Sequence, residues 1–228
     1  MTAISAHRRD ETGLAGIAAA VESGAEYVEL DVRLTGDGVL VVHHDRATRD
    51  GIALSRSPYD RLRGADGGPL PRVDEAVQTI APRAKGHIDL KERGCEHAVV
   101  ELALEAFGAD RFVVTTRDLV SIREIKKSFP QVRTALSVGR SLWEPGVLCD
   151  LAPVRLLRSS GADMVALNFR MARLGVLGQC ARAGFPAMVW TVNAEPDMRR
   201  FLGDHRVEVL VTDHPAAALR LREDPVSR

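Results

Sequence analysis

Residues 111–137 read RFVVTTRDLVSIREIKKSFPQVRTALS, a short apolar strand, an amphipathic helical stretch and a second short strand. The apolar runs 111–116 and 132–137 have the length of strands, and Asp118 opens the stretch 118–129 in the manner of a helix N-cap. Two strands joined by a helix indicate a parallel pair, because a parallel connection needs a crossover of a dozen or more residues.

The same strand–helix unit repeats along the whole chain. Strands are predicted at 3–7, 27–34, 85–91, 111–116, 132–137, 163–168, 187–192 and 207–212. Helices are predicted at 11–23, 73–80, 96–107, 118–129, 150–160, 171–183, 195–203 and 214–222, with Gly24 and Gly184 at helix ends and Asp213 at a helix start. Eight strands, each followed by a helix, predict an α/β fold of the (β/α)8 (TIM barrel) type and not a doubly wound sheet. We expect one domain over residues 1–228.

The segment after the second strand departs from this alternation. TGDG at 35–38 separates YVELDVRL from VLVVHHD, and this is a strong hairpin signal. If residues 36 and 37 form the turn, His44 lies opposite Glu29, and if residues 37 and 38 form it, His44 lies opposite Asp31. In both registers His44 shares a face with a carboxylate, and adjacent His43 becomes a packing or rim residue. A loop insertion of about 46–72 follows the hairpin.

The composition narrows the possible partners and location. Basic and acidic residues number 31 each, so the formal net charge is zero, which argues against nucleic acid or an anionic membrane as a general partner. The cysteines Cys95, Cys149 and Cys180 form no CxxC pair, and thus favour neither a disulfide framework nor a thiolate metal site. The N-terminus has no signal-peptide pattern, and no apolar stretch approaches the ~18 residues of a membrane span. We expect a cytoplasmic protein without an integral membrane segment; its oligomeric state stays open.

Ionisable residues gather at the predicted carboxyl ends of the first strands, where barrels carry their active sites. They are His7, Arg8, Glu29, Asp31, His44, Asp89 and Lys91. The i, i+2 pairs on each strand point to one side, so three carboxylates meet at one mouth and repel unless a cation lies between them. An all-oxygen set suits Mg²⁺ or Ca²⁺. Two histidines beside such a cation, with an Arg and a Lys, form an acid–base pair around an anion site that fits a phosphate.

The order of motifs resembles the glycerophosphodiester phosphodiesterase family over nearly the whole chain. The motifs are His7-Arg8, Glu11-Thr12, Gly24-Ala25-Glu26, Glu29-Leu30-Asp31-Val32, Asp37-Gly38, His44-Asp45, PLPRVDEAV, HIDLK, VWTVN and LVTDHP. The chain differs from the family pattern in four respects. Arg9 replaces a glycine, and the loop between Arg8 and Glu11 is several residues shorter. Thr12 and Gly13 stand where the family has Asn and Thr, and Asp89 replaces a glutamate as in the related sphingomyelinase D branch.

The resemblance implies metal-dependent hydrolysis of glycerophosphodiesters to glycerol 3-phosphate and an alcohol. Transferred by position, His7 and His44 form the acid–base pair, and Glu29, Asp31 and Asp89 bind one divalent cation, Mg²⁺ or Ca²⁺. Arg8 and Lys91 contact the phosphate, and Glu11 and Trp190 line the substrate site. The alternatives are a sphingomyelinase D-like lyase that releases a cyclic phosphate and a catalytically inactive phosphodiester-binding barrel.

Overall fold

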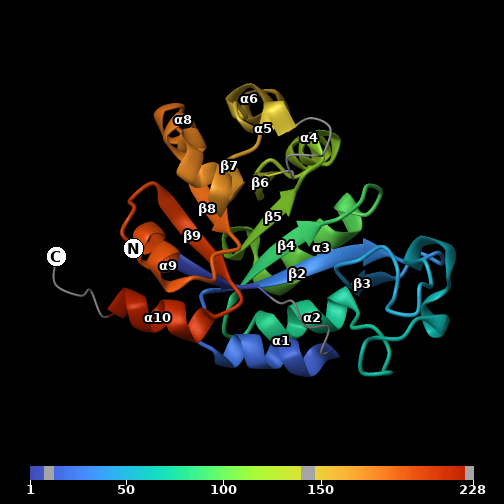
Figure 1. Ribbon diagram of the computed structural model, residues 1–228. Coiled ribbons are helices and arrows are strands. Elements are labelled where there is room, and N and C mark those ends of the chain that lie inside the picture. Colours follow the sequence, from blue (N-terminus) through green and yellow to red (C-terminus); the bar gives the residue numbers. More distant parts are fainter. Residues whose placement is uncertain (8–12, 140–146, 224–228) are drawn as a thin grey trace.

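Eight parallel strands close into a barrel in the computed structural model, which describes residues 1–7, 13–139 and 147–223 (Figure 1). The strands are β1 (Ala3–Ala6), β2 (Tyr27–Leu34), β4 (Lys85–Leu90), β5 (Phe112–Thr116), β6 (Arg133–Val138), β7 (Met164–Asn168), β8 (Ala187–Trp190) and β9 (Val207–Thr212). Their order is β1-β9-β8-β7-β6-β5-β4-β2, and pairing of β1 with β2 closes the ring. The predicted (β/α)8 barrel is confirmed.

Helices surround the strands (Figure 1). They are α1 (Gly13–Glu22), α2 (Val73–Ile80), α3 (Glu96–Phe107), α4 (Leu119–Ser128), α5 (Val147–Asp150), α6 (Val154–Ser160), α7 (Phe169–Met171), α8 (Leu177–Arg182), α9 (Glu195–Leu202) and α10 (Pro215–Glu223). Short turns complete the set: η1 (Leu54–Arg56), η2 (Tyr59–Arg61), η3 (Ala109–Arg111) and the π-helical η4 (Ala172–Val176). Within the described ranges, none of the helices has both the length and the apolar content needed to cross a membrane.

Two predicted helices are broken. The stretch predicted as one helix at 150–160 forms α5 and α6, with Pro153 as the N-cap of α6. Proline has no backbone N–H and cannot continue a helix through its interior, which explains the break. The stretch predicted at 171–183 is divided among α7, η4 and α8. Gly175, inside η4, has a φ of 94°, which is outside the helical range and marks a kink.

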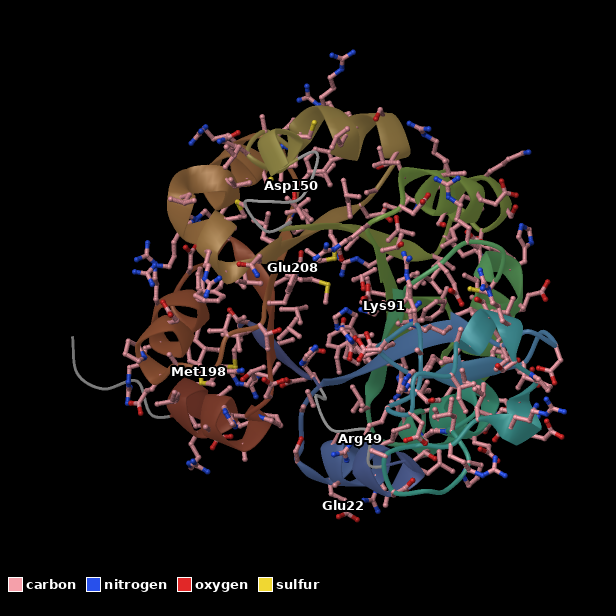
Figure 2. The ribbon with its side chains drawn as sticks, turned by 45° about the vertical axis from the view of Figure 1, so that its right-hand side comes forward. Glu22, Arg49, Lys91, Asp150, Met198 and Glu208 are labelled. Carbon is pink, nitrogen blue, oxygen red and sulfur yellow. The ribbon has the colours of Figure 1, made fainter. Side chains whose placement is uncertain are left out.

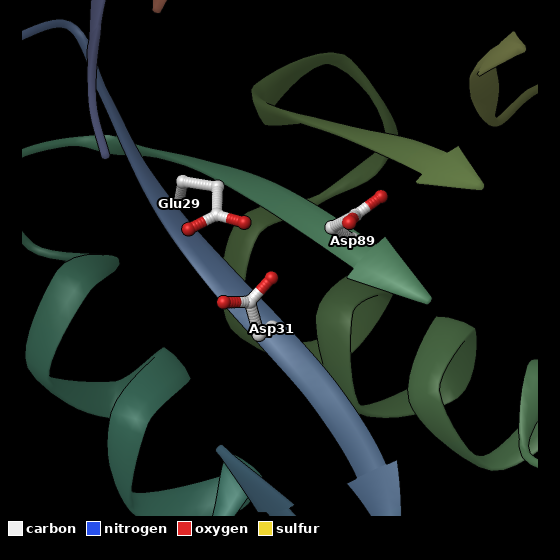
Figure 3. Close-up of side chains that lie close together, drawn as sticks. All are labelled: Glu29, Asp31 and Asp89. Atoms are coloured by element: carbon white, nitrogen blue, oxygen red, sulfur yellow. The ribbon is translucent and has the colours of Figure 1, made fainter. Parts of the chain in front are cut away.

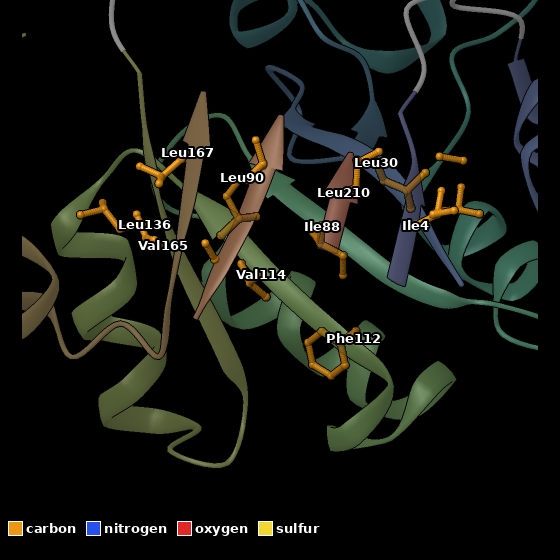
Figure 4. Close-up of a cluster of buried hydrophobic side chains, with 14 of the residues drawn as sticks. Ile4, Leu30, Ile88, Leu90, Phe112, Val114, Leu136, Val165, Leu167 and Leu210 are labelled. Carbon is orange, nitrogen blue, oxygen red and sulfur yellow. The ribbon is translucent and has the colours of Figure 1, made fainter. Parts of the chain in front are cut away.

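Alternation along the strands creates two cores. One set of side chains points outward against the helices (Figure 4): Ile4, Leu30, Ile88, Leu90, Phe112, Val114, Leu136, Val165, Leu167 and Leu210. The other set fills the inside of the barrel: Tyr27, Val113, Ala135, Met164, Ala166, Met188, Val209 and Val211. By the same alternation, Ser5, Glu29, Asp31, His87, Asp89 and Thr115 point inward. The barrel interior is therefore apolar in one part and polar in another.

The hairpin exists, but neither predicted register is correct. Strand β3 (Leu40–Val42) pairs antiparallel with β2 through Val32↔Val42 and Leu34↔Leu40. The loop has three residues, 36–38, because Thr35 N–H donates to the Val39 carbonyl (3.0 Å) and the Thr35 hydroxyl accepts from Val39 N–H (2.9 Å). Gly38 ends the loop with a φ of 84°, a conformation that glycine adopts without strain. The odd loop length shifts the register by one residue from each prediction.

The shift places His43, not His44, beside Asp31, whose carbonyl accepts from His43 N–H (2.9 Å). The segment after β3 then covers the hairpin edge, since Val42 N–H donates to the Pro71 carbonyl (2.8 Å). This segment has its own small apolar cluster, formed by Val41, Leu54, Leu62 and Leu70.

Candidate active site

Three carboxylates meet inside the barrel. Glu29 and Asp31 project from β2, and Asp89 projects from β4 directly opposite Asp31 (Figure 3). One oxygen from each lies within 4.8 Å of the others. Glu29 and Asp31 are only 4% and 5% exposed. The polar face of VELDVRL is thus an interior face and not a solvated strand surface.

Lys91 is the cation next to this cluster. Its Nζ lies 2.7 Å from Asp31 Oδ1 and also pairs with Asp89 Oδ2. Burial by itself lowers the pKa of Lys91, but the carboxylates of Asp89, Asp31 and Glu29 outweigh burial and raise the pKa. Figure 2 shows Lys91 inside the ring of helices, whereas Glu22 lies on the outside. Lys91 therefore stays charged and brings a fixed positive charge to the mouth of the barrel.

One lysine does not balance three carboxylates, of which Glu29 and Asp31 are buried and Asp89 is half-buried. Burial, and next the charge of Asp31, raise the pKa of Glu29 well above its ordinary value. Burial also acts to raise the pKa of Asp31, but the charge of Lys91 and the hydrogen bond from Glu29 outweigh it and lower that pKa. Excess negative charge on oxygen donors from neighbouring strands fits a hard divalent cation such as Mg²⁺ or Ca²⁺.

His7 is oriented by two residues from the end of the barrel sequence. It follows β1, and its Nδ1 lies 2.6 Å from Asp213 Oδ1. Asn193 Nδ2 donates to Asp213 Oδ2 (2.5 Å), while Asn193 Oδ1 accepts from Thr212 Oγ1 (3.1 Å) and from Asp213 N–H (3.0 Å). Because the carboxylate is an acceptor, the imidazole proton belongs on Nδ1, and Nε2 is left for the pocket.

His44 is held by its backbone. Arg33 donates from Nε (2.9 Å) and Nη2 (2.7 Å) to the His44 carbonyl, beyond the end of β3. The His44 side chain is exposed, and its Nδ1 lies 2.8 Å from Asp45 Oδ1. Arg33, and not the strand register, positions His44. His43 is 3% exposed, with Nε2 3.0 Å from the Ala47 carbonyl, as expected of a packing residue.

A buried hydrogen-bonded chain supports Asp89, and the sequence analysis missed it. Thr115 Oγ1 donates to Asp89 Oδ1 (2.6 Å), His87 Nε2 lies 3.2 Å from Thr115 Oγ1, and His87 Nδ1 lies 3.0 Å from Ser5 Oγ. Burial lowers the pKa of His87 to about 4, so this imidazole is neutral near pH 7 and serves as a hydrogen-bond link. The i, i+2 spacing of His87 and Asp89 could have identified it.

A pocket of about 370 Å³ joins these groups, a size suited to a small ligand. It is lined by His7, Glu29, His44, Asp45, His87, Asp89, Lys91, Thr115, Arg117, Ser137, Ala166, Trp190, Thr191 and Val211. Of the predicted site residues, Asp31 lies in the adjoining carboxylate cluster, and six others are among those lining residues. Arg8 and Glu11, together with Arg9, lie outside the described residues.

Arg117 is a further pocket residue that the sequence analysis missed. It follows β5 directly, and its Cζ lies 5.8 Å from the centroid of the Trp190 ring at the end of β8. A position immediately after a barrel strand was the available signal. Asp213, which follows β9, was missed as a partner of His7 for the same reason.

Known proteins resemble this chain in sequence and in fold. Residues 4–92 match the model of the glycerophosphoryl diester phosphodiesterase family. A glycerophosphodiester phosphodiesterase of Caldanaerobacter subterraneus is 26% identical, over 96% of this chain and 97% of its own length. A crystal structure of a glycerophosphodiester phosphodiesterase from Parabacteroides distasonis has a TM-score of 0.81 at 20% identity, covering 99% of this chain and 98% of that one. An Oleispira antarctica phosphodiesterase in complex with the product sn-glycerol-3-phosphate has a TM-score of 0.78 at 19% identity, over 98% and 97% of the two chains.

Proposed function

We propose that this chain, whose residues 4–92 match the glycerophosphoryl diester phosphodiesterase family, is a member of that family and hydrolyses small glycerophosphodiesters to glycerol 3-phosphate and an alcohol. The observation that carries the proposal is one pocket in which two histidines, each with Nδ1 against a carboxylate, adjoin a cluster of three carboxylates, two of them buried. The name of the Caldanaerobacter relative and the product bound by the Oleispira protein support the same reaction class.

Glu29, Asp31 and Asp89 would hold one divalent cation, Mg²⁺ or Ca²⁺. When bound there, the cation supplies positive charge that stabilises the phosphoryl oxygens. The Lys91 ammonium, close to Asp31 and Asp89, adds a second positive charge on the same side of the pocket. Phosphate contact by Arg8 and a substrate contact by Glu11 follow from the family resemblance and stay predictions.

The two histidines move the protons. One imidazole removes a proton from the attacking hydroxyl, which is water or the neighbouring hydroxyl of the substrate, and the other protonates the leaving alkoxide. The carboxylates of Asp213 and Asp45 keep the proton on Nδ1 of His7 and of His44. Each Nε2 is therefore able to accept or donate in the pocket.

A kinetic panel tests this proposal. Glycerophosphocholine, glycerophosphoethanolamine and related diesters are assayed with Mg²⁺, with Ca²⁺ and with a chelator, and turnover is expected only with a metal. His7→Ala and His44→Ala should each cost at least ~100-fold in turnover. Full activity in either variant would refute the mechanism.

A diester with a p-nitrophenyl leaving group assigns the two roles. Nitrophenolate leaves without protonation, so the variant that lacks the general acid should lose much less activity on this substrate than on an alkyl diester. The variant that lacks the general base should lose activity on both substrates. Equal losses in both variants on both substrates would contradict a division into acid and base.

Phosphorus NMR separates the remaining readings. A cyclic phosphate as the end product would favour the sphingomyelinase D-like lyase, and tight binding without any product would favour an inactive phosphodiester-binding barrel. A cytoplasmic location, and the lack of a nucleic-acid partner, stay predictions from the sequence.

A further inference from the structure

The pocket has two chemically different sides. The histidines, carboxylates and Lys91 come from the neighbouring strands β1, β2 and β4 and from the hairpin beside β2. The opposite wall comes from β5 to β8 and contains Arg117, Ser137, Ala166 and Trp190. Among the described residues that line this second wall, Arg117 alone carries a charge. A substrate whose phosphate meets the first side must extend its remaining atoms toward the second.

Arg117 and Trp190 form a cation–π pair in that wall. The guanidinium lies over the half-buried indole, with Cζ 5.8 Å from the ring centroid, which is within the range of a cation–π contact. A guanidinium is planar and carries its N–H donors in a fork that matches a carboxylate. The indole thus packs against a side chain whose donor geometry suits an organic anion.

The backbone on both sides of Arg117 is fixed. Thr116 is buried, and its hydroxyl accepts from Asp118 N–H (3.2 Å). The Asp118 carboxylate accepts from Val120 N–H (2.8 Å) at the start of α4 and from Arg93 Nε (2.7 Å). The Asp118 carboxylate therefore caps α4 and pairs with Arg93. These contacts on the residue after Arg117 fix the position of the Arg117 backbone at the end of β5.

We propose that Arg117 and Trp190 form a subsite for the alcohol half of the diester that favours alcohols bearing a carboxylate, as in glycerophosphoserine. This inference rests on the proposed function, and it adds the chemical class of the alcohol. The Arg117 guanidinium binds the carboxylate, and the Trp190 ring holds the guanidinium in place.

The same pair disfavours a quaternary ammonium group. Choline groups bind to the faces of aromatic rings, but Arg117 covers a face of Trp190 and carries the same charge as choline. Replacing Arg117 by Ala should therefore lower the KM for glycerophosphocholine while it raises the KM for glycerophosphoserine. Opposite changes for two substrates separate a specific subsite from a general loss of activity.

The critical comparison uses glycerophosphoserine and glycerophosphoethanolamine, which differ by one carboxylate. The ratio of their kcat/KM values should fall about fivefold in Arg117→Met, mostly through the KM for the serine diester, because an exposed charge pair contributes up to ~1 kcal/mol. Arg117→Lys keeps the charge without the planar fork, so an intermediate ratio is expected. An unchanged ratio in Arg117→Met overturns the subsite.

Arg93→Met is the matched control. Arg93 is an exposed arginine that pairs with Asp118 and does not line the pocket. Its removal changes the net charge equally and should leave the serine-to-ethanolamine ratio as in the parent protein. A drop as large as that of Arg117→Met would mean that only the general charge near the mouth matters, and would overturn the proposal.

A binding measurement separates this inference from the proposed function. O-phosphoserine and phosphoethanolamine are titrated calorimetrically into the parent protein and Arg117→Met, with no turnover required. A preference for phosphoserine that disappears in Arg117→Met supports the subsite even where no diester is hydrolysed, a result that would refute only the proposed function. If diesters are hydrolysed but the preference for phosphoserine is the same in the parent protein and in Arg117→Met, the subsite is refuted and the proposed activity is not.

Discussion

Asp213→Asn should impair turnover because an amide cannot satisfy both neighbours of this side chain. Asp213 accepts from His7 Nδ1 (2.6 Å) on one oxygen and from Asn193 Nδ2 (2.5 Å) on the other. An Asn at 213 sets its NH₂ group against one of these two donors. Asn193 cannot rotate its amide to help, since its Oδ1 already accepts from Thr212 Oγ1 (3.1 Å) and Asp213 N–H (3.0 Å).

The size of the effect follows from the bond that is lost. A hydrogen bond to a charged group contributes about 1.5–3 kcal/mol, which corresponds to a loss in kcat of about 10- to 150-fold at 1.36 kcal/mol per factor of ten. KM should change little, because Asp213 acts on the orientation and tautomer of His7. The double variant Asn193→Asp/Asp213→Asn exchanges the two side chains and again pairs a donor with an acceptor at each contact. It should recover at least about tenfold of the lost kcat, as expected for two coupled residues.

The assay is release of glycerol 3-phosphate from glycerophosphoethanolamine, with circular dichroism to verify folding. Asp204→Asn is the matched control, because the Asp204 carboxylate pairs with Arg206 and does not line the pocket. Unchanged kcat in Asp213→Asn would refute the orienting role. A double variant no better than Asp213→Asn would refute the donor–acceptor account.

Four further outcomes follow from contacts elsewhere. Thr115→Val removes the hydroxyl that donates to Asp89 (2.6 Å) and should weaken Mg²⁺ or Ca²⁺ binding by about 10- to 100-fold in calorimetry; unchanged affinity would contradict this support. Exposed Cys149 should react with a thiol reagent at pH 8, whereas buried Cys180 should react only after unfolding, because burial raises its pKa to about 11. Because the buried thiol keeps its proton up to about pH 11 while the unfolded chain loses it near pH 9, the free energy of unfolding should fall between these two pH values. In urea denaturation, Cys180→Ala, which lacks the thiol, should show a smaller fall over this range than the parent protein. Gly139→Ala should lower the free energy of unfolding by about 1–3 kcal/mol, because the new Cβ would lie 2.3 Å from Asn168 Cβ at a φ of 142°, and an unchanged melting temperature would contradict this packing.

The strands were predictable because each barrel strand is covered on both sides. The outer face of such a strand is apolar, and its inner face is apolar or carries functional residues. In the sequence it is therefore a short, mostly apolar segment, which differs clearly from the amphipathic pattern of the helices around it. The ranges predicted for the second and last strands, 27–34 and 207–212, coincide with β2 and β9. Helix breaks at Pro153 and Gly175 were missed because helical periodicity continues across each break and gives no sign of a change in direction.

The hairpin register was not predictable from its loop sequence. Gly36-Asp37 and Asp37-Gly38 both suit two-residue turns, but the Thr35 hydroxyl closes a three-residue loop instead. A one-residue shift exchanges the faces of a strand. His43 therefore lies opposite Asp31, a pairing that neither predicted register contained. His44 still reaches the pocket because the strand ends at Val42 and Arg33 binds the His44 carbonyl.

The two sides of the pocket differ in how much the sequence can disclose. Carboxylates on β2 and β4 are conspicuous because ionisable groups are rarely fully buried unless they are paired. Their spacing, together with their places at the ends of successive predicted strands, pointed to a cation. Arg117 is one of 31 basic residues, and its partner Trp190 lies in β8, on the far side of β6 and β7 in the sheet order. Only barrel closure brings the two together over one pocket. The proposed selection of the alcohol by Arg117 could therefore change by substitution at a single strand end without disturbing the carboxylate cluster, and the matched serine and ethanolamine diesters measure that independence directly.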